Sequence, residues 1–330
     1  MSGGSRASAL TLVAAIAALW VLTRGDGQAS SPPAGPSTAS AAAHRFPRPG
    51  PARLFATPAE AAQGLAAAWR SGASAEILSL FGPAGEALVR SGDRVADHRE
   101  RQWLADAYDA AHSLQLRGAR EAVLLLGHDQ WPYPVPMVRV ENGWRFDAAA
   151  GAREIIDRRI GRNELHVIAV LRTIVEAERD YAAQAPAGAP RAFAARITSS
   201  AGQHDGLYWP TSETETASPL GPLVAAAEAH GLGESVEREF SPFHGYYFNI
   251  LTRQGSDAPG GAKSYLQDGR LSRGFGVVAW PAIYGDSGVM TFIVNQDGIV
   301  FQKNFGPQTR IIARQIFEYD PDGSWRPAPP

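Results

Sequence analysis

The fold of the carboxyl half follows from residues 163–183, NELHVIAVLRTIVEAERDYAA, and from the strands predicted after them. Apolar residues recur in this stretch at alternating spacings of three and four, which is the period of one face of an α-helix. They are Val167, Val170, Ile174, Ala177 and Tyr181. The pattern predicts a long amphipathic helix that buries this stripe against a second layer. The cationic residues 151–162 before it predict a connecting helix that breaks at Gly161.

The second layer is predicted between residues 246 and 303. Four runs rich in β-branched and aromatic residues are separated there by turn residues. The runs are YYFNIL (246–251), GFGVVAW (274–280), GVMTFIVN (288–295) and IVFQK (299–303). Gln296-Asp297-Gly298 predicts a tight hairpin between the last two runs. We expect a long helix packed on a four-stranded antiparallel meander, because each layer then buries the apolar face of the other.

The helices of the amino-terminal half are predicted from their start and stop signals. Thr57-Pro58-Ala59-Glu60 is a capping box, with a hydroxyl at the N-cap, Pro at the first helical position and Glu two residues after it. Gly72 ends this helix. Ser74 and Asp97 are predicted to cap two further helices.

Strands are predicted after these helices. They cover residues 121–127, 135–140 and 143–147. Asn142-Gly143 joins the last two as a two-residue type I′ turn. Helices first and a meander second predict an α+β domain in which a curved antiparallel sheet wraps around the helices.

The 330 residues are enough for two domains. We predict one domain over residues 54–150 and a second over residues 151–330. A stretch rich in Pro, residues 185–240, interrupts the second domain as an insert. The fold class expected is α+β with two domains.

The amino terminus predicts export. Arg6 precedes an uncharged run from Ala7 to Thr23, so residues 1–27 are expected to be either a signal peptide or an N-terminal membrane anchor. Residues 28–53 are rich in Pro, Ala and Ser and predict a disordered linker. Both alternatives place the protein in the periplasm or anchored in a membrane and facing the periplasm.

Composition excludes several function classes. The chain has no Cys, which excludes disulfides, thiolate metal sites and cysteine nucleophiles. Its formal net charge of -2 argues against a nucleic-acid partner, which requires a surplus of cations. The eight His form neither an i, i+4 pair on a recognisable helix nor an H-E-x-x-H motif, so no metal and no cofactor is predicted.

The first domain resembles the nuclear-transport-factor-2-like (NTF2-like) cone in its order of elements, its T-P-x-E helix start and its terminal strand GWRFD (143–147). The resemblance implies an apolar pocket, in which some relatives carry a catalytic acid–base pair. The polar candidates for such a pair are Tyr108, Asp109, His112, His128, Asp129 and Tyr133. Trp131 and Tyr133 are candidates for the wall of a ligand pocket. Each of these residues also has a plain structural interpretation, in packing or in a turn.

The second domain is similar to pilin and pseudopilin headgroups. The similarity lies in N-E-x-x-x-I-x-x-L-R-T-I at 163–174 and in A-W-P-x-x-Y-G-x-S-G-x-x-T-F-x-V-N-x-D-G at 279–298. It implies a helical spine packed on a small antiparallel sheet. A filament subunit also needs an apolar half-helix before this spine, whereas Arg158, Arg159 and Arg162 occupy that position. Assembly into a fibre is therefore not expected.

A wider resemblance covers roughly residues 55–307. The segments RRIGRNEL, ILTRQGSDAPGGAKSYL and GFGVVAWPAIYGDSGVMTFIVNQDGIVFQK resemble a bacterial family labelled domain of unknown function 2950. This resemblance implies no activity.

Two groups in the second domain are candidates for binding. The Gly-rich loop 255–261, flanked by Arg253 and Lys263, is either an anion site formed by main-chain N–H groups or a tight loop capped by Asp257. Trp280 and Tyr284 are candidates for an exposed aromatic patch that contacts a partner.

No catalytic constellation is recognisable, so the sequence favours an exported, non-enzymatic binding or assembly module of the cell envelope. Its partner would be an envelope protein or a small apolar ligand, and its only membrane contact would be the N-terminal segment. The alternative is a small-ligand carrier or enzyme that uses a pocket in the NTF2-like domain.

Overall fold

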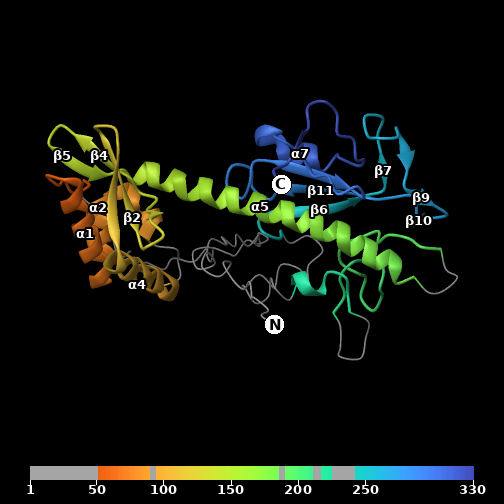
Figure 1. The fold of residues 1–330 in the computed structure, drawn as a ribbon, viewed down its shortest axis with the longest axis horizontal. Coiled ribbons are helices and arrows are strands. Elements are labelled where there is room, and N and C mark those ends of the chain that lie inside the picture. Colours follow the sequence, from red (N-terminus) through yellow and green to blue (C-terminus); the bar gives the residue numbers. More distant parts are fainter. Residues whose placement is uncertain (1–50, 90–93, 186–189, 211–216, 225–241) are drawn as a thin grey trace, which may run out of the picture. The chain divides into compact units, whose positions relative to one another are not determined.

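The computed structural model describes residues 51–89, 94–185, 190–210, 217–224 and 242–330. The chain is α+β, with helices and antiparallel sheets, as predicted. It divides into two compact units, one ending at Ile155 and the other beginning at Ile156 (Figure 1). The predicted signal or anchor lies outside the described residues, as does almost all of the linker. Among the described helices, none combines the length and the apolar character needed to cross a membrane.

The first unit begins with helix α1 (Pro58–Ser71), which carries the predicted capping box. Thr57 Oγ1 accepts a hydrogen bond from the Glu60 N–H at 3.2 Å, and the Glu60 carboxylate accepts one from the Ala56 N–H at 3.1 Å. Gly72 ends the helix in the left-handed conformation, at φ 67°. The bond to Thr57 satisfies an N–H group that the first helical turn leaves without a partner, and the bond from Ala56 fixes the chain just before the helix.

The remaining helices of this unit start differently from the prediction. Helix α2 (Ser74–Phe81) has Ser74 as its first helical residue, and Ala73 precedes it without a side-chain cap. Helix α4 (Arg94–Ala110) places Asp97 inside its first turn rather than at the cap. Two short elements lie between them, η1 (Pro83–Gly85) and α3 (Glu86–Val89).

The sheet of the first unit has the strand order β1-β2-β4-β5, with β3 paired to β2. The strands are β1 (His112–Arg117), β2 (Glu121–Leu126), β3 (Trp131–Pro132), β4 (Met137–Val140) and β5 (Gly143–Phe146). Strand β1 was not predicted, because its exposed side chains lack an apolar run. Val140 pairs with Gly143, so the hairpin turn is Glu141-Asn142, one residue before the predicted turn. A Cβ on Gly143 would lie 2.4 Å from the carbonyl oxygen of Phe55, which forms a bridge with Trp144.

Helix α5 (Ala148–Ala183) runs without interruption for 36 residues. The predicted break at Gly161 is therefore wrong. Gly lowers helix stability by about 1 kcal/mol relative to Ala, which tertiary packing readily outweighs. Ala148 lies in the core of the first unit, and Val167 lies in the core of the second. Packing at both ends favours a continuous helix.

The sheet of the second unit is an antiparallel meander with five strands rather than four. Its order is β6 (Tyr246–Leu251), β11 (Gly276–Pro281), β12 (Thr291–Asn295), β13 (Phe301–Lys303) and β14 (Arg326–Pro327). The added strand, β14, holds only two residues and contains a Pro, so its sequence has no strand signal. Two short ladders occupy the chain between β6 and β11. They pair β7 (Arg253–Gln254) with β8 (Lys263–Ser264), and β9 (Leu266–Gln267) with β10 (Arg270–Leu271).

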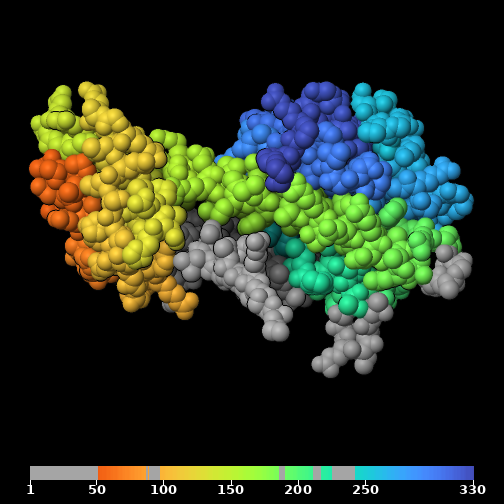
Figure 2. All heavy atoms as spheres, in the orientation of Figure 1, coloured from red at the N-terminus to blue at the C-terminus, as the bar shows by residue number. Residues whose placement is uncertain are grey.

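Side chains alternate between the two faces of this sheet. Val277, Ala279, Phe292 and Val294 pack with the apolar stripe of α5. Val278, Trp280 and Ile293 point to the other face and pack with Ala313, Tyr319 and their neighbours. That face is covered by η3 (Gly306–Gln308), α7 (Thr309–Ala313) and the chain beyond them. Figure 1 shows α7 beside β11, and Figure 2 shows the dark blue carboxyl-terminal residues on the surface of this unit.

The described parts of the predicted insert join the same core. Ala194, Leu207 and Leu220 are buried against the α5 stripe. Phe193 bridges to Leu271, and Thr198 bridges to Tyr208. The helix predicted over residues 222–230 lies largely outside the described residues.

Candidate functional site

Tyr108 and His112 lie together at the end of α4. Their rings are stacked, with centroids 3.7 Å apart and an interplanar angle of 11°. His112 Nδ1 lies 2.9 Å from the Tyr108 carbonyl oxygen, and burial raises the pKa of the Tyr108 hydroxyl. The pair is therefore held by stacking and by a main-chain contact.

Asp109, the neighbouring acid–base candidate, forms an ion pair with Arg70 of α1. Arg70 donates two hydrogen bonds to it and thereby lowers the pKa of the Asp109 carboxyl group. The Arg70 guanidinium also lies 5.7 Å from the centre of the Tyr108 ring. A carboxylate stabilised in its ionised form is a weak proton acceptor at neutral pH. Asp109 links two helices.

His128 and Asp129 are exposed in the turn after β2. The Gln130 N–H closes this turn on the carbonyl oxygen of Gly127 at 3.1 Å. The structure thus places these two candidates in a surface turn, whereas Tyr108 and Tyr133 lie in the core.

Trp131 and Tyr133 belong to a row of aromatic rings. Trp131 lies 5.6 Å from Trp103 and 6.5 Å from Tyr133, and Tyr133 lies 5.2 Å from Trp69, all measured between ring centroids and all edge to face. Burial raises the pKa of the Tyr133 hydroxyl above its ordinary value. These rings pack on one another, with Tyr133 and Trp69 inside the core.

The Gly-rich loop 255–261 holds an anion that belongs to the chain itself. The Asp320 carboxylate accepts hydrogen bonds from the N–H groups of Asp257, at 2.7 Å, and Ala258, at 3.2 Å. A Cβ on Gly255 would lie 2.3 Å from Asp320, so Gly permits the close approach. The sequence left open whether this stretch is an anion site or a tight loop, and tertiary structure brings the Asp320 carboxylate to its N–H groups from 63 residues away.

The two cations beside this loop also have partners. Arg253 forms an ion pair with Glu318, with Nε and Oε2 3.2 Å apart. Lys263 Nζ lies 5.8 Å from the centre of the Tyr265 ring. Buried Gln254 secures the loop from inside, because its Nε2 donates to the carbonyl oxygens of Pro259 and Gly261.

Trp280 and Tyr284 do not form an exposed pair. Trp280 is only 9% exposed and packs under the carboxyl-terminal segment. Its indole N–H is buried and has no hydrogen-bond partner among the described residues. Tyr284 is half-buried in the turn between β11 and β12.

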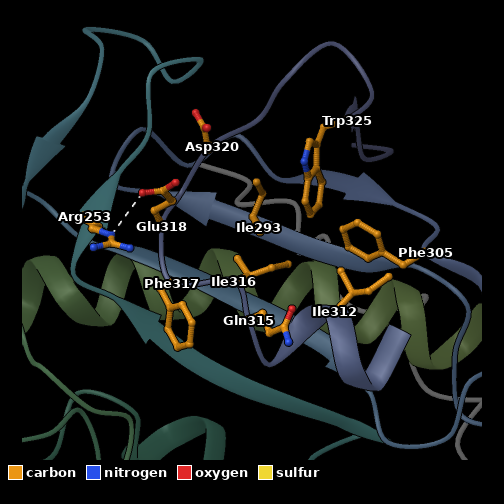
Figure 3. A pocket seen from close by; sticks show the side chains of 10 residues that line it. All are labelled: Arg253, Ile293, Phe305, Ile312, Gln315, Ile316, Phe317, Glu318, Asp320 and Trp325. Atoms are coloured by element: carbon orange, nitrogen blue, oxygen red, sulfur yellow. Dashed lines mark ion pairs between the residues drawn. The ribbon is translucent and has the colours of Figure 1, made fainter. Parts of the chain in front are cut away.

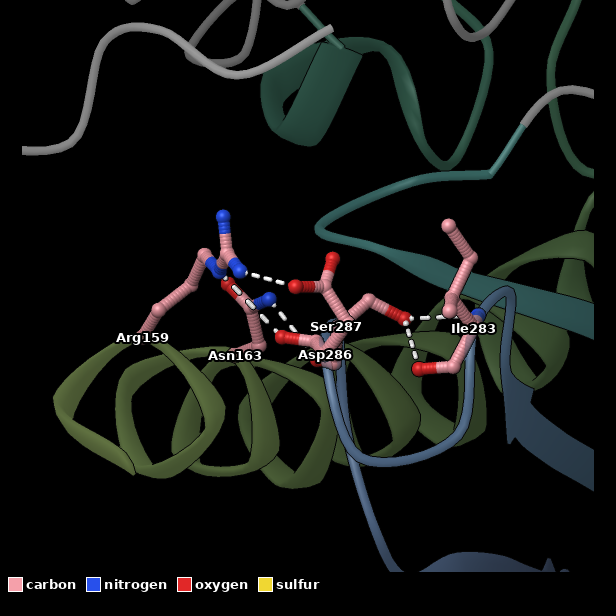
Figure 4. Close-up of polar contacts among 5 residues, drawn as sticks. All are labelled: Arg159, Asn163, Ile283, Asp286 and Ser287. Carbon is pink, nitrogen blue, oxygen red and sulfur yellow. Dashed lines mark hydrogen bonds and ion pairs between the residues drawn. The ribbon is translucent and has the colours of Figure 1, made fainter. Parts of the chain in front are cut away.

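A network of polar contacts fixes that turn to α5 (Figure 4). Arg159 pairs with the Asp286 carboxylate, and its Nε donates to the Asp286 carbonyl oxygen at 3.2 Å. Asn163 Nδ2 donates to the carbonyl oxygen of Ser287 at 2.8 Å. Ser287 Oγ accepts from the N–H of Ile283 at 3.0 Å.

Glu164, beside Asn163, continues this network. Its Oε1 accepts the N–H groups of Val289 and Met290, both at 2.9 Å. The segment RRIGRNEL therefore attaches α5 to the start of β12. No single-sequence signal marks these contacts, because the residues that they join are 124 to 127 positions apart.

A groove of about 350 Å³ opens between the sheet and the carboxyl-terminal segment (Figure 3). Its apolar wall consists of Ile293, Phe305, Ile312, Ile316, Phe317 and Trp325. Its polar residues are Arg253, Gln315, Glu318 and Asp320. The sequence did not identify this groove, because its walls come from β7, β12 and the segment 305–325.

The electrostatics of the groove are defined by paired charges. At one end the Arg253–Glu318 pair leaves Asp320 as an additional carboxylate. Beside Phe305 and Trp325, Lys303 Nζ lies 5.1 and 5.6 Å from the centres of the two rings and 3.9 Å from Asp322. The groove suits an apolar group, with no excess positive charge to attract an anion. Within the described ranges, no three His, Asp or Glu side chains come together as a metal site.

The comparisons with known proteins identify a family and no activity. A family model described as "Protein of unknown function (DUF2950)" matches residues 52–328. Neither the curated proteins nor the solved structures contain a match to the chain. The resemblances to the NTF2-like cone and to pilin headgroups therefore stay predictions. The match spans more than four fifths of the 330 residues, so the chain belongs to the DUF2950 family of proteins of unknown function.

Proposed function

We propose that this protein is an exported, non-enzymatic binding module of the cell envelope, and that the groove lined by Ile293, Ile312 and Trp325 binds an apolar segment of a partner protein. The observation that carries the proposal is the set of isoleucine and aromatic side chains that line the groove. Apolar side chains that stay accessible in a concave site favour binding, because an occupant removes their surface from water.

The charged side chains of the groove indicate which kind of partner segment it can bind. Glu318 is neutralised by Arg253, and Asp320 adds one negative charge beside them. An apolar segment that carries a neutral or basic residue suits this end, whereas an acidic one meets repulsion. The non-enzymatic role is supported by the first unit, where Asp109 is paired with Arg70 and His112 is stacked on Tyr108.

Adjacent isoleucines on α7 provide a matched test of the groove. Ile312 lines it, whereas its neighbour Ile311 is 65% exposed and is not part of its wall. We expect Ile312→Asp to weaken binding of the neutral apolar dye Nile red to the full chain by at least about tenfold, because a carboxylate then occupies the apolar wall. Ile311→Asp should leave the dye affinity unchanged.

Dye fluorescence titration measures both variants, and circular dichroism establishes that both are folded. Equal dye affinity in the two variants would contradict binding in the groove. Export is tested separately by fractionation and mass spectrometry of the full chain. Recovery of the protein in the cytoplasm would contradict the envelope location.

A further inference from the structure

Strand β1 is an edge of the first sheet. All six of its residues pair with β2, from His112 opposite Leu126 to Arg117 opposite Glu121. On its other side, no strand of the described ranges pairs with it. Such an edge presents a row of main-chain donors and acceptors on which another strand can pair.

The register shows which main-chain groups point outward. The Gly127 N–H donates to the carbonyl oxygen of Ala111 at 2.8 Å, which places this pair among the hydrogen-bonded pairs of the ladder. Hydrogen-bonded and non-hydrogen-bonded pairs alternate along an antiparallel ladder. The N–H and C=O groups of His112, Leu114 and Leu116 therefore point away from β2.

The features that commonly protect edge strands are missing from β1 itself. Its sequence HSLQLR contains no Pro, and the unbroken register contains no bulge. Its charged residue, Arg117, stands at the end. Leu116 is 64% exposed although it lies on the same face as Leu114, which packs against the core. This exposed leucine extends the apolar face of the sheet to its edge.

We propose that β1 pairs antiparallel with β1 of a second copy of this chain, about a two-fold axis at Gln115, and that this joins two five-stranded sheets into one. In this register Leu114 lies opposite Leu116 of the second copy, and Gln115 lies opposite its own equivalent. The outward-pointing groups of each strand then meet those of the other, as hydrogen bonding requires.

The side chains favour a second copy as the occupant. Four leucines, two from each copy, come together on the core face, where cross-strand pairs stabilise a sheet. Arg117 faces the hydroxyl of Ser113 and retains Glu121, 3.5 Å away, as its ion-pair partner. No charged residue of the strand faces a like charge. The two-fold arrangement is isologous, which is the commonest way in which identical chains associate.

The pairing is expected to be weak. A single strand pair buries less than the roughly 1,200 Å² typical of stable interfaces. Self-association should therefore depend on protein concentration, and a covalent trap is the appropriate measurement.

Because the chain has no Cys, single substitutions report the register directly. At the predicted axis, Gln115→Cys places two thiols in one non-hydrogen-bonded pair, within the Cα separation that a disulfide needs. Ser113→Cys on the same face is the matched control, because its two thiols lie roughly 13 Å apart, four residue steps along the strand. After oxidation of the full chain with diamide, we expect a covalent dimer for Gln115→Cys and at least tenfold less for Ser113→Cys. Equal cross-linking of the two variants, or none, would overturn the proposal.

The unmodified interface is tested by Leu116→Lys, which removes both leucine pairs and places two lysines on one face of the joined sheet, roughly 7 Å apart along the strands. Sedimentation equilibrium of the full chain should show reversible dimers that Leu116→Lys weakens at least tenfold, with the melting temperature unchanged because Leu116 is exposed. A protein that stays monomeric at every concentration would contradict the proposal. So would a protein whose β1 pairs only with a strand of another protein. The dye-binding experiment on the groove probes the second unit, whereas these experiments probe the first. Failure of one proposal can therefore be told apart from failure of the other.

Discussion

At the scale of single residues, two glutamates on α5 show how differently a carboxylate can be accommodated. Glu164 accepts two main-chain N–H groups, from Val289 and Met290. Glu178 is completely buried, and one of its oxygens accepts the Ala194 N–H at 2.7 Å. The other oxygen has no partner among the described residues. Burial raises the pKa of Glu178 to about 8.

This pKa predicts a pH dependence of stability. The unfolded chain releases the Glu178 proton near pH 4.5, whereas the folded chain keeps it up to about pH 8. The contribution of Glu178 to stability is therefore complete below pH 4.5 and is lost as the pH rises toward 8, by about 1.4 kcal/mol per pH unit. Glu178→Gln, a neutral isostere, should remove this slope in urea unfolding followed between pH 5 and 9.

The exposed Glu176 on the same helix provides the control. Glu176→Gln should retain the wild-type slope. The same pH dependence in Glu178→Gln and the wild type would show that the Glu178 carboxyl group does not keep its proton in the folded state.

At the scale of secondary structure elements, α5 carries two glycines in contrasting surroundings. A Cβ on Gly161 would meet no atom within 4 Å, whereas a Cβ on Gly151 would lie 2.7 Å from Cγ2 of Val135. Gly161→Ala should therefore raise the free energy of unfolding by about 0.5 to 1 kcal/mol, the difference between Gly and Ala inside a helix. Gly151→Ala should lower it, because Val135 must move. Urea unfolding of both variants measures the two effects, and destabilisation by Gly161→Ala would contradict a continuous helix.

At the scale of the whole molecule, the apolar core of the first unit is separate from the apolar clusters of the second, which predicts two separable unfolding events. Phe146 belongs to the core of the first unit and Phe292 to that of the second, and neither is exposed. Truncation of a buried Phe to Ala costs about 3 to 5 kcal/mol. We expect Phe146→Ala to accelerate hydrogen exchange in the sheet of the first unit and to leave β11 and β12 unchanged.

Phe292→Ala should produce the reciprocal pattern in hydrogen exchange measured by mass spectrometry. Acceleration in both sheets by either variant would instead show that α5, which contributes to both cores, couples them into one cooperative unit.

Local patterns account for what the sequence predicted about the fold. The capping box at Thr57, the α5 stripe and the runs that became β6, β11 and β12 all depend on residues a few positions apart. Strands β1 and β14 were not predicted. The side chains of β1 are mostly exposed and form no apolar run, and β14 is only two residues long. The hairpin turn lies one residue before the predicted position, and Gly143, which the prediction placed in the turn, is the first residue of β5 and lies against the Phe55 carbonyl oxygen.

The candidate sites were less accessible to sequence reasoning. The loop 255–261 could be either an anion site or a tight loop from its sequence, because the acceptor of its N–H groups, Asp320, lies 63 residues away from Asp257. Trp280 was a candidate for an exposed surface because an aromatic residue carries no local sign of the segment that covers it. The same segment forms one wall of the groove, so no local sequence pattern could indicate it.

By itself, the sequence determined the α+β class, the apolar stripe of α5, the meander and the membership of the DUF2950 family, because periodicity, capping and family motifs are written in neighbouring residues. Only the tertiary structure decided that α5 continues through Gly161, that Asp320 fills the glycine-rich loop, and that an apolar groove opens between β12 and the carboxyl-terminal segment. These outcomes depend on contacts between residues far apart in the chain, and such contacts form only when the packed layers bring them together.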